Sequence, residues 1–519
     1  MSRRLTRIGL GKHRVRWTSV LVCLLAGCHA PETNETTVGQ NSHRTVLNHA
    51  VSRPEPAQSH SNSNSPFQTV PTGILSLYEA LRIGLSANPD VRAAAARLEA
   101  ASARLSEAKS RYAPTVEFVQ ASFRAFQLPE SLEGVAGLIG PGSLGSTLGV
   151  SSLFSAFRAG SVDPFSEHST VFSASWVLFD GFLRQSTVEA ARHIENAARF
   201  AAWDVRRMLI RAIEAAFYQI QLSEERLRVA RADEAFNIEE ESTAEKLREA
   251  GRASSADALN FRVRLLAARA EVALASGLLD AARVALAELM GVPDAMLSEQ
   301  VNVEPLGAEI AADLANPDIE QKLRQAMSDR PDLKQLEEVV RSEEAGIRAA
   351  KSLYWPSIAL AGSWGFDRTS NLAYSEDDQS SAGGIAFRWE VFSGGRRKAK
   401  VRQADSARDE ASAGLSRLRI AVASEVRRAG IHVIDAQRQV ALQRETLEAA
   451  RENRRVVQAA YRAGKESSSR LNEVQRDCVT AEAHLVTARI RLRQAWSEMH
   501  SAVGHTTSDM DSAPLQPLP

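Results

Sequence analysis

The chain has 519 residues, with 63 Lys and Arg against 63 Asp and Glu, 6% aromatic residues and 3 Cys. Its length exceeds that of one ordinary compact domain, and its balanced charge gives no basic footprint for nucleic acid. Three Cys without repeated spacing exclude a disulfide framework and a zinc ribbon. Ala, Arg, Glu and Leu dominate residues 190–300 and 400–500, a composition typical of long helices and not of a catalytic α/β domain.

The first segment has the pattern of a secretory signal. Residues 1–16 contain six basic residues and no acidic one, and a short apolar run then leads to Leu25-Ala26-Gly27-Cys28. This run is too short to span a bilayer. The sequence Leu25-Ala26-Gly27-Cys28 resembles the lipobox of bacterial lipoproteins, which implies a signal peptide at 1–27 and a lipid anchor on Cys28. An ordinary signal peptide with a chance Cys is the alternative.

The next segment, residues 28–72, is rich in Ser, Asn, Thr, His and Pro. It has too few apolar residues to form a core, so we expect a disordered tether. We expect a second disordered segment, a tail, at 506–519. No later stretch of the chain has 18 consecutive apolar residues, so the sequence predicts no transmembrane helix. A mature chain that crosses a membrane would therefore have to do so as a closed barrel.

An internal duplication organises the rest of the chain. Asn88-Pro89-Asp90 recurs as Arg330-Pro331-Asp332 at an offset of 242 residues, and the segment 176–181 matches 389–394 at an offset of 213. Because the offset changes only once, the extra length lies in one loop, and the same framework occurs twice. The predicted units are repeat 1 at 73–300, an inter-repeat linker at 301–318 and repeat 2 at 319–505.

Each repeat contains a long stretch without proline. Seventy residues separate Gly181 from Gly251, and the same number separates Gly394 from Gly464. A single helix of that length would measure about 105 Å. Two shorter helices nearly cover the same distance on the return path, so each repeat is expected to form a long coiled-coil hairpin, with its tip near residue 251 or 464.

Between the helices, alternating apolar and polar residues predict two strands in each repeat. Phe387, Trp389 and Val391 alternate with charged residues, and Trp176 has the same place in repeat 1. An apolar face opposite a polar one is typical of a membrane strand, so we expect Trp176, Phe387 and Trp389 to face lipid. A soluble sandwich is the alternative. Four strands cannot close a barrel, and other copies of the chain would have to pair with the open edges.

These landmarks, in this order and repeated twice, resemble the TolC-type outer membrane efflux family in its lipoprotein branch. The resemblance covers residues 74–505. It implies a mainly α fold with a membrane β-barrel: duplicated coiled-coil helices that form an α-barrel, and four strands per protomer. It also implies a homotrimer with a 12-stranded barrel in the outer membrane lipids and an α-helical tunnel in the periplasm. The expected partners are a periplasmic adaptor protein and an inner-membrane pump of the RND or ABC type.

The function that this resemblance implies is passive export of small molecules such as drugs, toxic compounds or metals, driven by the pump. An exit duct for type I protein secretion is one alternative, and a periplasmic coiled-coil scaffold lipoprotein is an alternative of another class. The sequence contains no Ser-His-Asp pattern and no His at metal-ligand spacing, so we predict no enzyme activity, no catalytic residue, no metal and no cofactor. No nucleic-acid partner is expected either.

The resemblance also implies roles for the hairpin tips. Asp257 and Tyr461 match family positions whose polar contacts keep the tunnel mouth closed, although Glu466 stands where the family has a basic partner. Glu473 would contribute to a ring of three carboxylates that favours cations. Residues 127–168 would form an extracellular loop. The residues expected to dock the adaptor are Gly251, Arg252, Ser254, Ser255, Gly464, Lys465 and Ser467.

Overall fold

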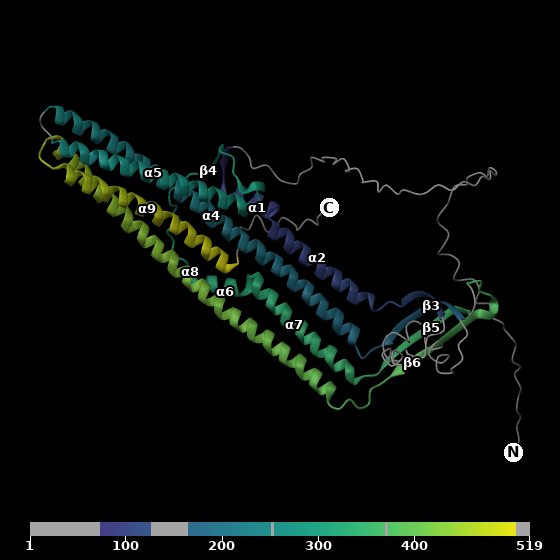
Figure 1. The fold of residues 1–519 in the computed structure, drawn as a ribbon. Helices are drawn as coiled ribbons and strands as arrows, with labels where there is room; N and C mark the ends of the chain where they lie inside the picture. Colours follow the sequence, from purple (N-terminus) through teal and green to yellow (C-terminus); the bar gives the residue numbers. More distant parts are fainter. Residues whose placement is uncertain (1–72, 126–164, 251–253, 369–371, 505–519) are drawn as a thin grey trace, which may run out of the picture. The chain divides into compact units, whose positions relative to one another are not determined.

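The computed structural model describes residues 73–125, 165–250, 254–368 and 372–504 (Figure 1). The signal peptide, the tether with Cys28 and the tail expected at 506–519 lie outside the described residues. None of the described helices is long and apolar enough to be a membrane span.

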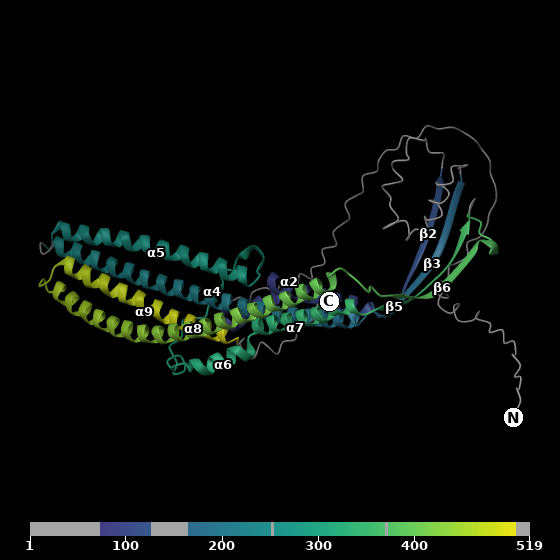
Figure 2. The same cartoon turned by 90° about the horizontal axis from the view of Figure 1, so that it is seen from below.

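Long paired helices make up most of the described chain. α4 and α8 have 67 residues each, which corresponds to about 100 Å. α5 packs along α4 and α9 packs along α8, and α9 also packs against α4, so the two hairpins lie side by side (Figure 2). The helices of repeat 1 are α1 (Leu77–Ala87), α2 (Pro89–Ser110), α4 (Leu183–Glu249) and α5 (Ser255–Leu289). Those of repeat 2 are α6 (Ile319–Asp329), α7 (Pro331–Lys351), α8 (Arg396–Arg462) and α9 (Ser468–Val503).

Proline sets the same helix boundary in both repeats. Pro89 and Pro331 occupy the first positions of α2 and α7, where their missing N–H needs no partner. The residues before them, Asn88 and Arg330, have ψ angles of 131° and 125°. This extended conformation, which proline imposes on its predecessor, ends α1 and α6.

Apolar stripes on the helices form the core. Ile213, Phe217 and Ile220 of α4 are at most 1% exposed, and they pack with α1, α5 and two short strands, β1 (Gly73–Leu75) and β4 (Val301–Val303). β1 and β4 pair in parallel. A second cluster joins α7, α8 and α9 around Val426 and Met499. Each repeat therefore has its own apolar core at the middle of the long helices.

The remaining strands form one antiparallel sheet in the order β2-β3-β5-β6. Within it, β3 of repeat 1 pairs with β5 of repeat 2, so the sheet joins the repeats and leaves β2 and β6 as its edges. Phe118, Phe172 and Trp364 lie opposite one another on adjacent strands, with ring centroids 4.8 and 5.9 Å apart. The strands are β2 (Thr115–Ala125), β3 (Phe165–Phe179), β5 (Ser357–Arg368) and β6 (Gln379–Arg388). Short 3-10 turns lie at Pro293–Ala295, Ser352–Tyr354 and Glu376–Asp378.

Two strand limits differ from the prediction. β3 begins at Phe165, so the last residues of the segment expected to be a loop at 127–168 are strand, and 126–164 lies outside the described residues. β6 ends at Arg388, so the alternation that predicted a strand through Trp389 and Val391 was wrong for the single chain. The physical reason is that β6 is an edge strand whose second side has no partner among the described residues.

Candidate functional site: the hairpin tips and the helix junctions

The hairpin tips lie at the end of the helices away from the sheet (Figure 1). In repeat 1, α4 ends at Glu249 and α5 begins at Ser255. Ser254 and Asp257 form a capping box, in which the amide of Asp257 donates to Ser254 Oγ at 3.2 Å and the amide of Ser254 donates to the Asp257 carboxylate at 3.1 Å. These two bonds satisfy backbone amides that the start of a helix leaves without partners.

Repeat 2 makes its tip with a left-handed glycine. α8 ends at Arg462, Gly464 has a φ of 73°, and the amide of Lys465 donates to the carbonyl of Ala460 at 2.9 Å. This arrangement is a Schellman motif, which favours glycine at the position of positive φ. Ser467 then caps the first turn of α9.

The residues predicted to dock an adaptor lie on the surface wherever the structure describes them. Gly251 and Arg252 lie outside the described residues. The exposed members of the predicted set are Ser254, Ser255, Gly464, Lys465 and Ser467.

Asp257 connects the two hairpins. Ser468 of α9 donates its hydroxyl to the Asp257 carboxylate, which also accepts a bond from the Ser254 hydroxyl at 2.8 Å. The hydrogen bond from Ser468, followed by those from Ser254, lowers the pKa of the Asp257 carboxyl. Asp257 is therefore a charged acceptor that holds the start of α5 against the start of α9.

Tyr461, for which the resemblance implies a polar contact, makes none with the described residues of the single chain. Its side chain is 7% exposed and packs on Phe261, with ring centroids 5.9 Å apart, and its hydroxyl has no hydrogen-bond partner among the described residues. Burial, followed by the nearby Asp257 and Glu240 carboxylates, raises the pKa of this hydroxyl. The hydroxyl of Ser468 bonds to Asp257 instead, so the contribution of Tyr461 is apolar packing.

A buried carboxylate that sequence reasoning missed completes the contact between the hairpins. Glu240 of α4 is 0% exposed and accepts a hydrogen bond from Gln458 of α8 at 2.7 Å. Arg462 donates to Glu240 at 3.2 Å and to Glu239 at 2.8 Å. The run of acids at 239–241 shows negative charge in the sequence but not which acid is buried. We call Glu240, Gln458 and Arg462, together with Asp257 and Ser468, the tip junction.

Glu473 lies on the surface near the tip. Its side chain is 54% exposed and pairs with Arg470 one turn earlier in α9, at 2.7 Å. Such an exposed pair contributes little to stability. It leaves the carboxylate accessible to solvent.

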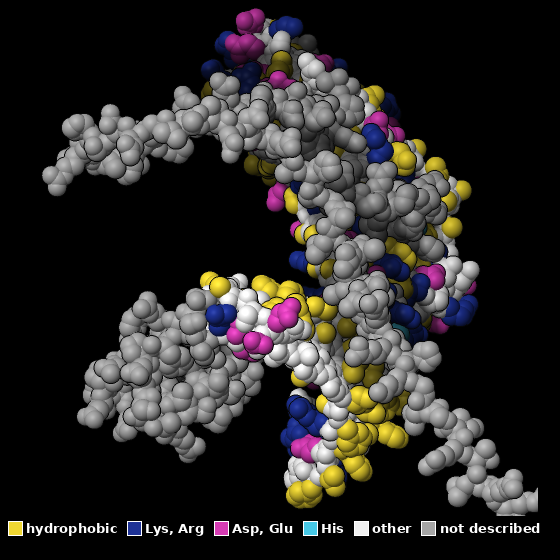
Figure 3. All heavy atoms as spheres, turned by 90° about the vertical axis from the view of Figure 1, so that its right-hand side faces the viewer, with side chains coloured by type: hydrophobic (Ala, Val, Ile, Leu, Met, Phe, Trp, Pro, Cys, Tyr) yellow, Lys and Arg dark blue, Asp and Glu magenta, His cyan; other side chains and the backbone are white. Residues whose placement is uncertain are grey.

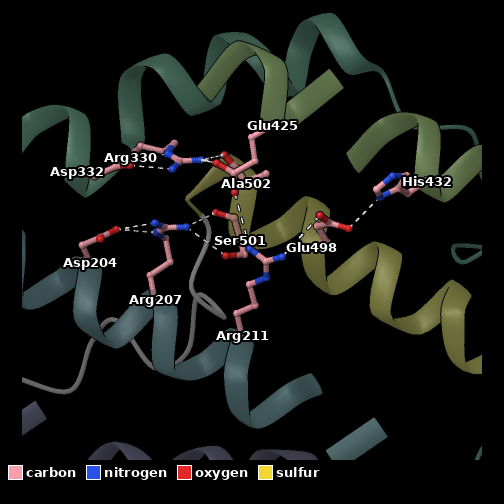
Figure 4. A network of polar contacts seen from close by, with 10 residues as sticks. All are labelled: Asp204, Arg207, Arg211, Arg330, Asp332, Glu425, His432, Glu498, Ser501 and Ala502. Atoms are coloured by element: carbon pink, nitrogen blue, oxygen red, sulfur yellow. Dashed lines mark hydrogen bonds and ion pairs between the residues drawn. The ribbon is translucent and has the colours of Figure 1, made fainter. Parts of the chain in front are cut away.

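Two buried arginines secure the other end of α9, as Figure 4 shows. Arg207 of α4 donates to the carbonyl of Ser501 at 3.0 Å, and Arg330 donates to the carbonyl of Ala502 at 2.9 Å. Basic side chains at a helix C-terminus donate hydrogen bonds to the carbonyls that have no partner in the helix. Burial alone would raise the pKa of the adjacent Asp332, but its hydrogen bonds with Arg330 and the charge of Arg330 outweigh burial and lower it.

The inter-repeat linker crosses the second hairpin through charged contacts. Glu309 pairs with Arg444 of α8 at 2.8 Å and also with Arg489 of α9. Asp313 pairs with Arg493 of α9 at 2.9 Å. The linker therefore connects α8 to α9 near their middle.

The junctions between strands and helices are built alike in both repeats. Arg184 lies over the ring of Tyr112, with its guanidinium carbon 5.0 Å from the centroid, and donates to the carbonyl of Val177 at 2.5 Å. Its repeat equivalent Arg397 lies 5.3 Å over Tyr354 and donates to the carbonyl of Val391 at 2.8 Å. The sequence analysis did not single out either arginine, although the repeat offset aligns them.

The predicted lipid-facing residues are exposed at this end of the molecule. Trp176 is 42% exposed, Phe387 is 64% and Trp389 is 52%. Figure 3 shows hydrophobic side chains gathered along one side of this region, next to small residues and backbone drawn white. The indoles of Trp176 and Trp389 donate to the carbonyls of Tyr112 and Tyr354 at 2.9 and 3.3 Å, which places both rings at the junction with the helices.

The described residues hold no group of three His, Cys, Asp or Glu side chains arranged for a metal ion. Cys478 is 1% exposed in α9, and burial raises the pKa of its thiol, which disfavours the reactive thiolate.

Comparison with known structures supports the fold. OprN, described as an outer-membrane channel, matches with a TM-score of 0.67 and 21% identity, over 83% of this chain and 90% of that chain. The CmeC outer membrane channel of Campylobacter jejuni matches with a TM-score of 0.65 and 16% identity, over 84% and 88%. The MtrE outer membrane channel of Neisseria gonorrhoeae, in its open state, matches with a TM-score of 0.66 and 19% identity, over 82% and 88%. No significant match to a curated protein was found.

A family model described as outer membrane efflux protein matches residues 81–292 and 323–505, which together make up most of the chain. The predicted fold of long paired helices with four strands is confirmed, and so is the predicted outer membrane efflux family, whereas its lipoprotein branch stays a prediction. The chain therefore belongs to the outer membrane efflux protein family, whose members are transport channels and not enzymes, as the sequence predicted.

Proposed function

We propose that this outer membrane efflux channel works as a homotrimer, in which three copies complete a 12-stranded barrel and an α-helical tunnel that extends into the periplasm. The observation that carries this proposal is that the sheet formed by the described residues has four strands and two open edges. In lipid each unpaired backbone group at an edge costs several kcal/mol, and about eight strands are the fewest that close a membrane barrel. Strands of 10 to 15 residues are long enough to cross a bilayer.

The exposed face of α8 supports the same assembly. Ile420, Ile431 and Leu442 are 73%, 61% and 57% exposed. At an offset of 213 residues they correspond to Arg207, Tyr218 and Val229 of α4, which are buried or half-buried, and Arg207 and Tyr218 contact α9. A second copy of the chain, placed on α8 as repeat 2 is placed on α4, would cover these apolar side chains with its α5.

In this proposal the channel is a passive duct for small molecules such as drugs, toxic compounds or metals. A periplasmic adaptor would dock on the exposed tip residues, and an inner-membrane pump of the RND or ABC type would supply the energy. An exit duct for type I protein secretion would use the same trimer and is the alternative. Membership in the efflux family argues against a periplasmic scaffold lipoprotein.

The tip junction is the proposed closed gate. Asp257 with Ser468, and Glu240 with Gln458 and Arg462, hold the two hairpins together, so docking of an adaptor would have to separate these pairs to widen the mouth. The proposed role of Tyr461 is packing at the aperture. Exposed Glu473 residues would line the opening and favour cations.

Two further parts of the proposal concern the N-terminal lipid anchor and the residues that contact lipid. Cys28 would carry the lipid anchor of a lipoprotein after removal of 1–27, and 28–72 would connect the anchor to repeat 1. Trp176 and Phe387, with Trp389 at the junction with the helices, would contact lipid. Mass spectrometry of the purified chain, with Cys28→Ala as the control, would detect the acyl groups.

The experiment that tests the function has two parts. A strain that lacks this gene should lose resistance to exported compounds, and the wild-type chain should restore it. The purified chain should migrate as a heat-dissociable trimer and conduct single-channel current in a planar bilayer. A folded chain that stays monomeric in detergent and never conducts current would contradict the proposal.

A further inference from the structure

Two charged side chains stand without partners at opposite edges of the sheet. Glu117 lies in β2 and Arg388 ends β6, and both are exposed. In the part of the chain that the structure describes, neither side chain makes an ion pair or a hydrogen bond. Among the side chains that the structure describes, Glu117 and Arg388 therefore give the two edges uncompensated charges of opposite sign.

The internal repeat determines how the two edges would meet. Inside the chain β3 pairs with β5, with Ser175 opposite Ala361. β6 is the repeat equivalent of β3, at an offset of 213 residues, and β5 is the repeat equivalent of β2, at an offset of 242 residues. The repeat equivalent of the β3–β5 pairing therefore joins β6 to β2 of another copy. The same register then places Arg388 opposite Val119, and it places Glu390 opposite Glu117.

We propose that Arg388 of one copy forms an ion pair with Glu117 of the next copy across this β6–β2 seam. The inference rests on the proposed homotrimer and adds its pairing register. Arg388 and Glu117 are diagonal neighbours on the same face, a separation that long side chains bridge. Glu390, directly opposite Glu117, already pairs with Arg396 at 2.6 Å, so two acids and two bases meet at each seam.

The strand limits support this register independently. β3 continues to Phe179, whose equivalent is Phe392, whereas β6 ends four residues earlier at Arg388. The final residues of β3 have β5 as a partner, but the residues after Arg388 have no partner strand in the described part of the chain. In the proposed seam these residues would pair with the start of β2 from the next copy.

The surroundings of two equivalent glycines, where the strands join the long helices, also support the β6–β2 seam. Gly181 has a φ of 67°, and a Cβ there would lie 2.6 Å from Cβ of Trp355. Its equivalent Gly394 has a φ of 57° and no neighbour within 4 Å. By the repeat, Ala113 of the next copy would occupy the place of Trp355.

The charges distinguish the seam between copies from the pairing inside the chain. At the β3–β5 pairing the equivalents of Arg388 and Glu117 are Ser175 and Ala359, which carry no charge. A sheet edge that slipped by one residue would move its side chains to the opposite face. The ion pair therefore selects the correct partner strand and the correct register.

A charge exchange tests the ion pair. We expect Glu117→Arg and Arg388→Glu each to reduce the fraction of heat-resistant trimer by about fivefold, because each places like charges on the two edges. The double variant with both substitutions should restore the wild-type fraction. Glu376→Arg, at an exposed carboxylate in the loop between β5 and β6, makes the same change of charge away from the seam and should leave the trimer unchanged.

Cysteine cross-linking tests the register in the full-length protein. Val119→Cys combined with Arg388→Cys should form a disulfide between copies, whereas Gln120→Cys with Arg388→Cys, one residue out of register, should not. A double charge exchange without recovery, or cross-linking of the slipped pair alone, would overturn the ion pair while leaving the trimer intact. A wild-type chain that is monomeric would overturn the homotrimer and the ion pair with it.

Discussion

Individual buried charges in this chain have opposite effects that depend on their partners. Glu240 is fully buried, yet it accepts bonds from Gln458 and Arg462. Glu214, half-buried on α4, has the Ser497 hydroxyl as its hydrogen-bond donor. Burial raises the pKa of Glu214, and the bond from Ser497 offsets only part of that rise. A carboxylate with a basic partner thus holds elements together, whereas one without such a partner lowers the stability of the fold when ionised.

The first prediction concerns the tip junction. Arg462→Ala should leave the Glu240 carboxylate buried with a single donor, which destabilises the closed contact between the hairpins. We expect a larger mean single-channel conductance in planar bilayers. Tyr461→Phe is the matched control, because the Tyr461 hydroxyl makes no hydrogen bond with any residue that the structure describes, and it should keep the wild-type conductance. A wild-type conductance in Arg462→Ala, together with a raised conductance in Tyr461→Phe, would refute the assignment of the tip junction as the closed gate.

The second prediction concerns pH. Because the pKa of Glu214 is raised in the folded chain, the folded state binds this proton more tightly than the unfolded state. The stabilisation is complete below the unfolded pKa of about 4.3 and is lost as the pH rises through the folded pKa. We expect Glu214→Gln to unfold at a higher temperature than wild type at pH 7, with the difference shrinking toward pH 4. Equal effects at both pH values would contradict this explanation.

At the scale of the elements, the repeats use one design with different residues. Asn88 donates to the carbonyl of Leu289 at 2.8 Å and so completes the end of α5. Its equivalent Arg330 donates to the carbonyl of Ala502, which is the equivalent of Leu289, at the end of α9. The glycines that follow, Gly291 and Gly504, both have positive φ and lie against these residues. The same joint therefore relies on a neutral amide in repeat 1 and on a charged network in repeat 2.

The third prediction compares the two joints by thermal unfolding of the purified protein. Arg330→Ala removes the shared partner of Asp332 and Glu425 inside the protein, and we expect it to cost about 3–5 kcal/mol. Asn88→Ala removes a helix cap and one bond to a carbonyl, and should cost about 1–2 kcal/mol. A larger loss for Asn88→Ala would show that the network around Arg330 contributes little.

At the scale of the whole molecule, the exposed apolar residues Ile420, Ile431 and Leu442 of α8 lie where a neighbouring copy is expected. The long exposed face of α8 and the open edges β2 and β6 share one explanation, because the repeat places a second copy against both. A hydrophobic face of this extent on a single chain favours association. Contacts that repeat 1 makes with repeat 2 inside the chain thus have repeat equivalents that would form only between two copies.

The fourth prediction tests this face. Leu442→Glu should place a charge in the proposed contact between copies, and we expect most of the trimer to dissociate in size-exclusion chromatography in detergent. Gln439→Glu on the same helix is the control, because its equivalent Arg226 remains exposed in repeat 1 even with both neighbours present. Dissociation by both variants, or by neither, would argue against the proposed arrangement.

The sequence alone was sufficient for the framework. Proline and glycine landmarks that occur twice locate the hairpins, and a helix without proline between Gly181 and Gly251 has a length that follows from 1.5 Å per residue. The buried stripe of Ile213, Phe217 and Ile220 follows from helical periodicity. These properties are local, or repeat along the chain, so they can be read without knowing which segments meet.

The tertiary structure decided which polar groups find partners. Glu239, Glu240 and Glu241 are indistinguishable in the sequence, and only the approach of α8 makes Glu240 the buried acceptor. The same packing leaves the Tyr461 hydroxyl without a hydrogen-bond partner among the described residues, and it lets the Ser468 hydroxyl donate to Asp257. The end of β6 at Arg388 has a similar cause, since a strand extends only as far as its partner does. Contacts between residues some 200 positions apart depend on the packing of whole helices, and local patterns carry no information about that packing.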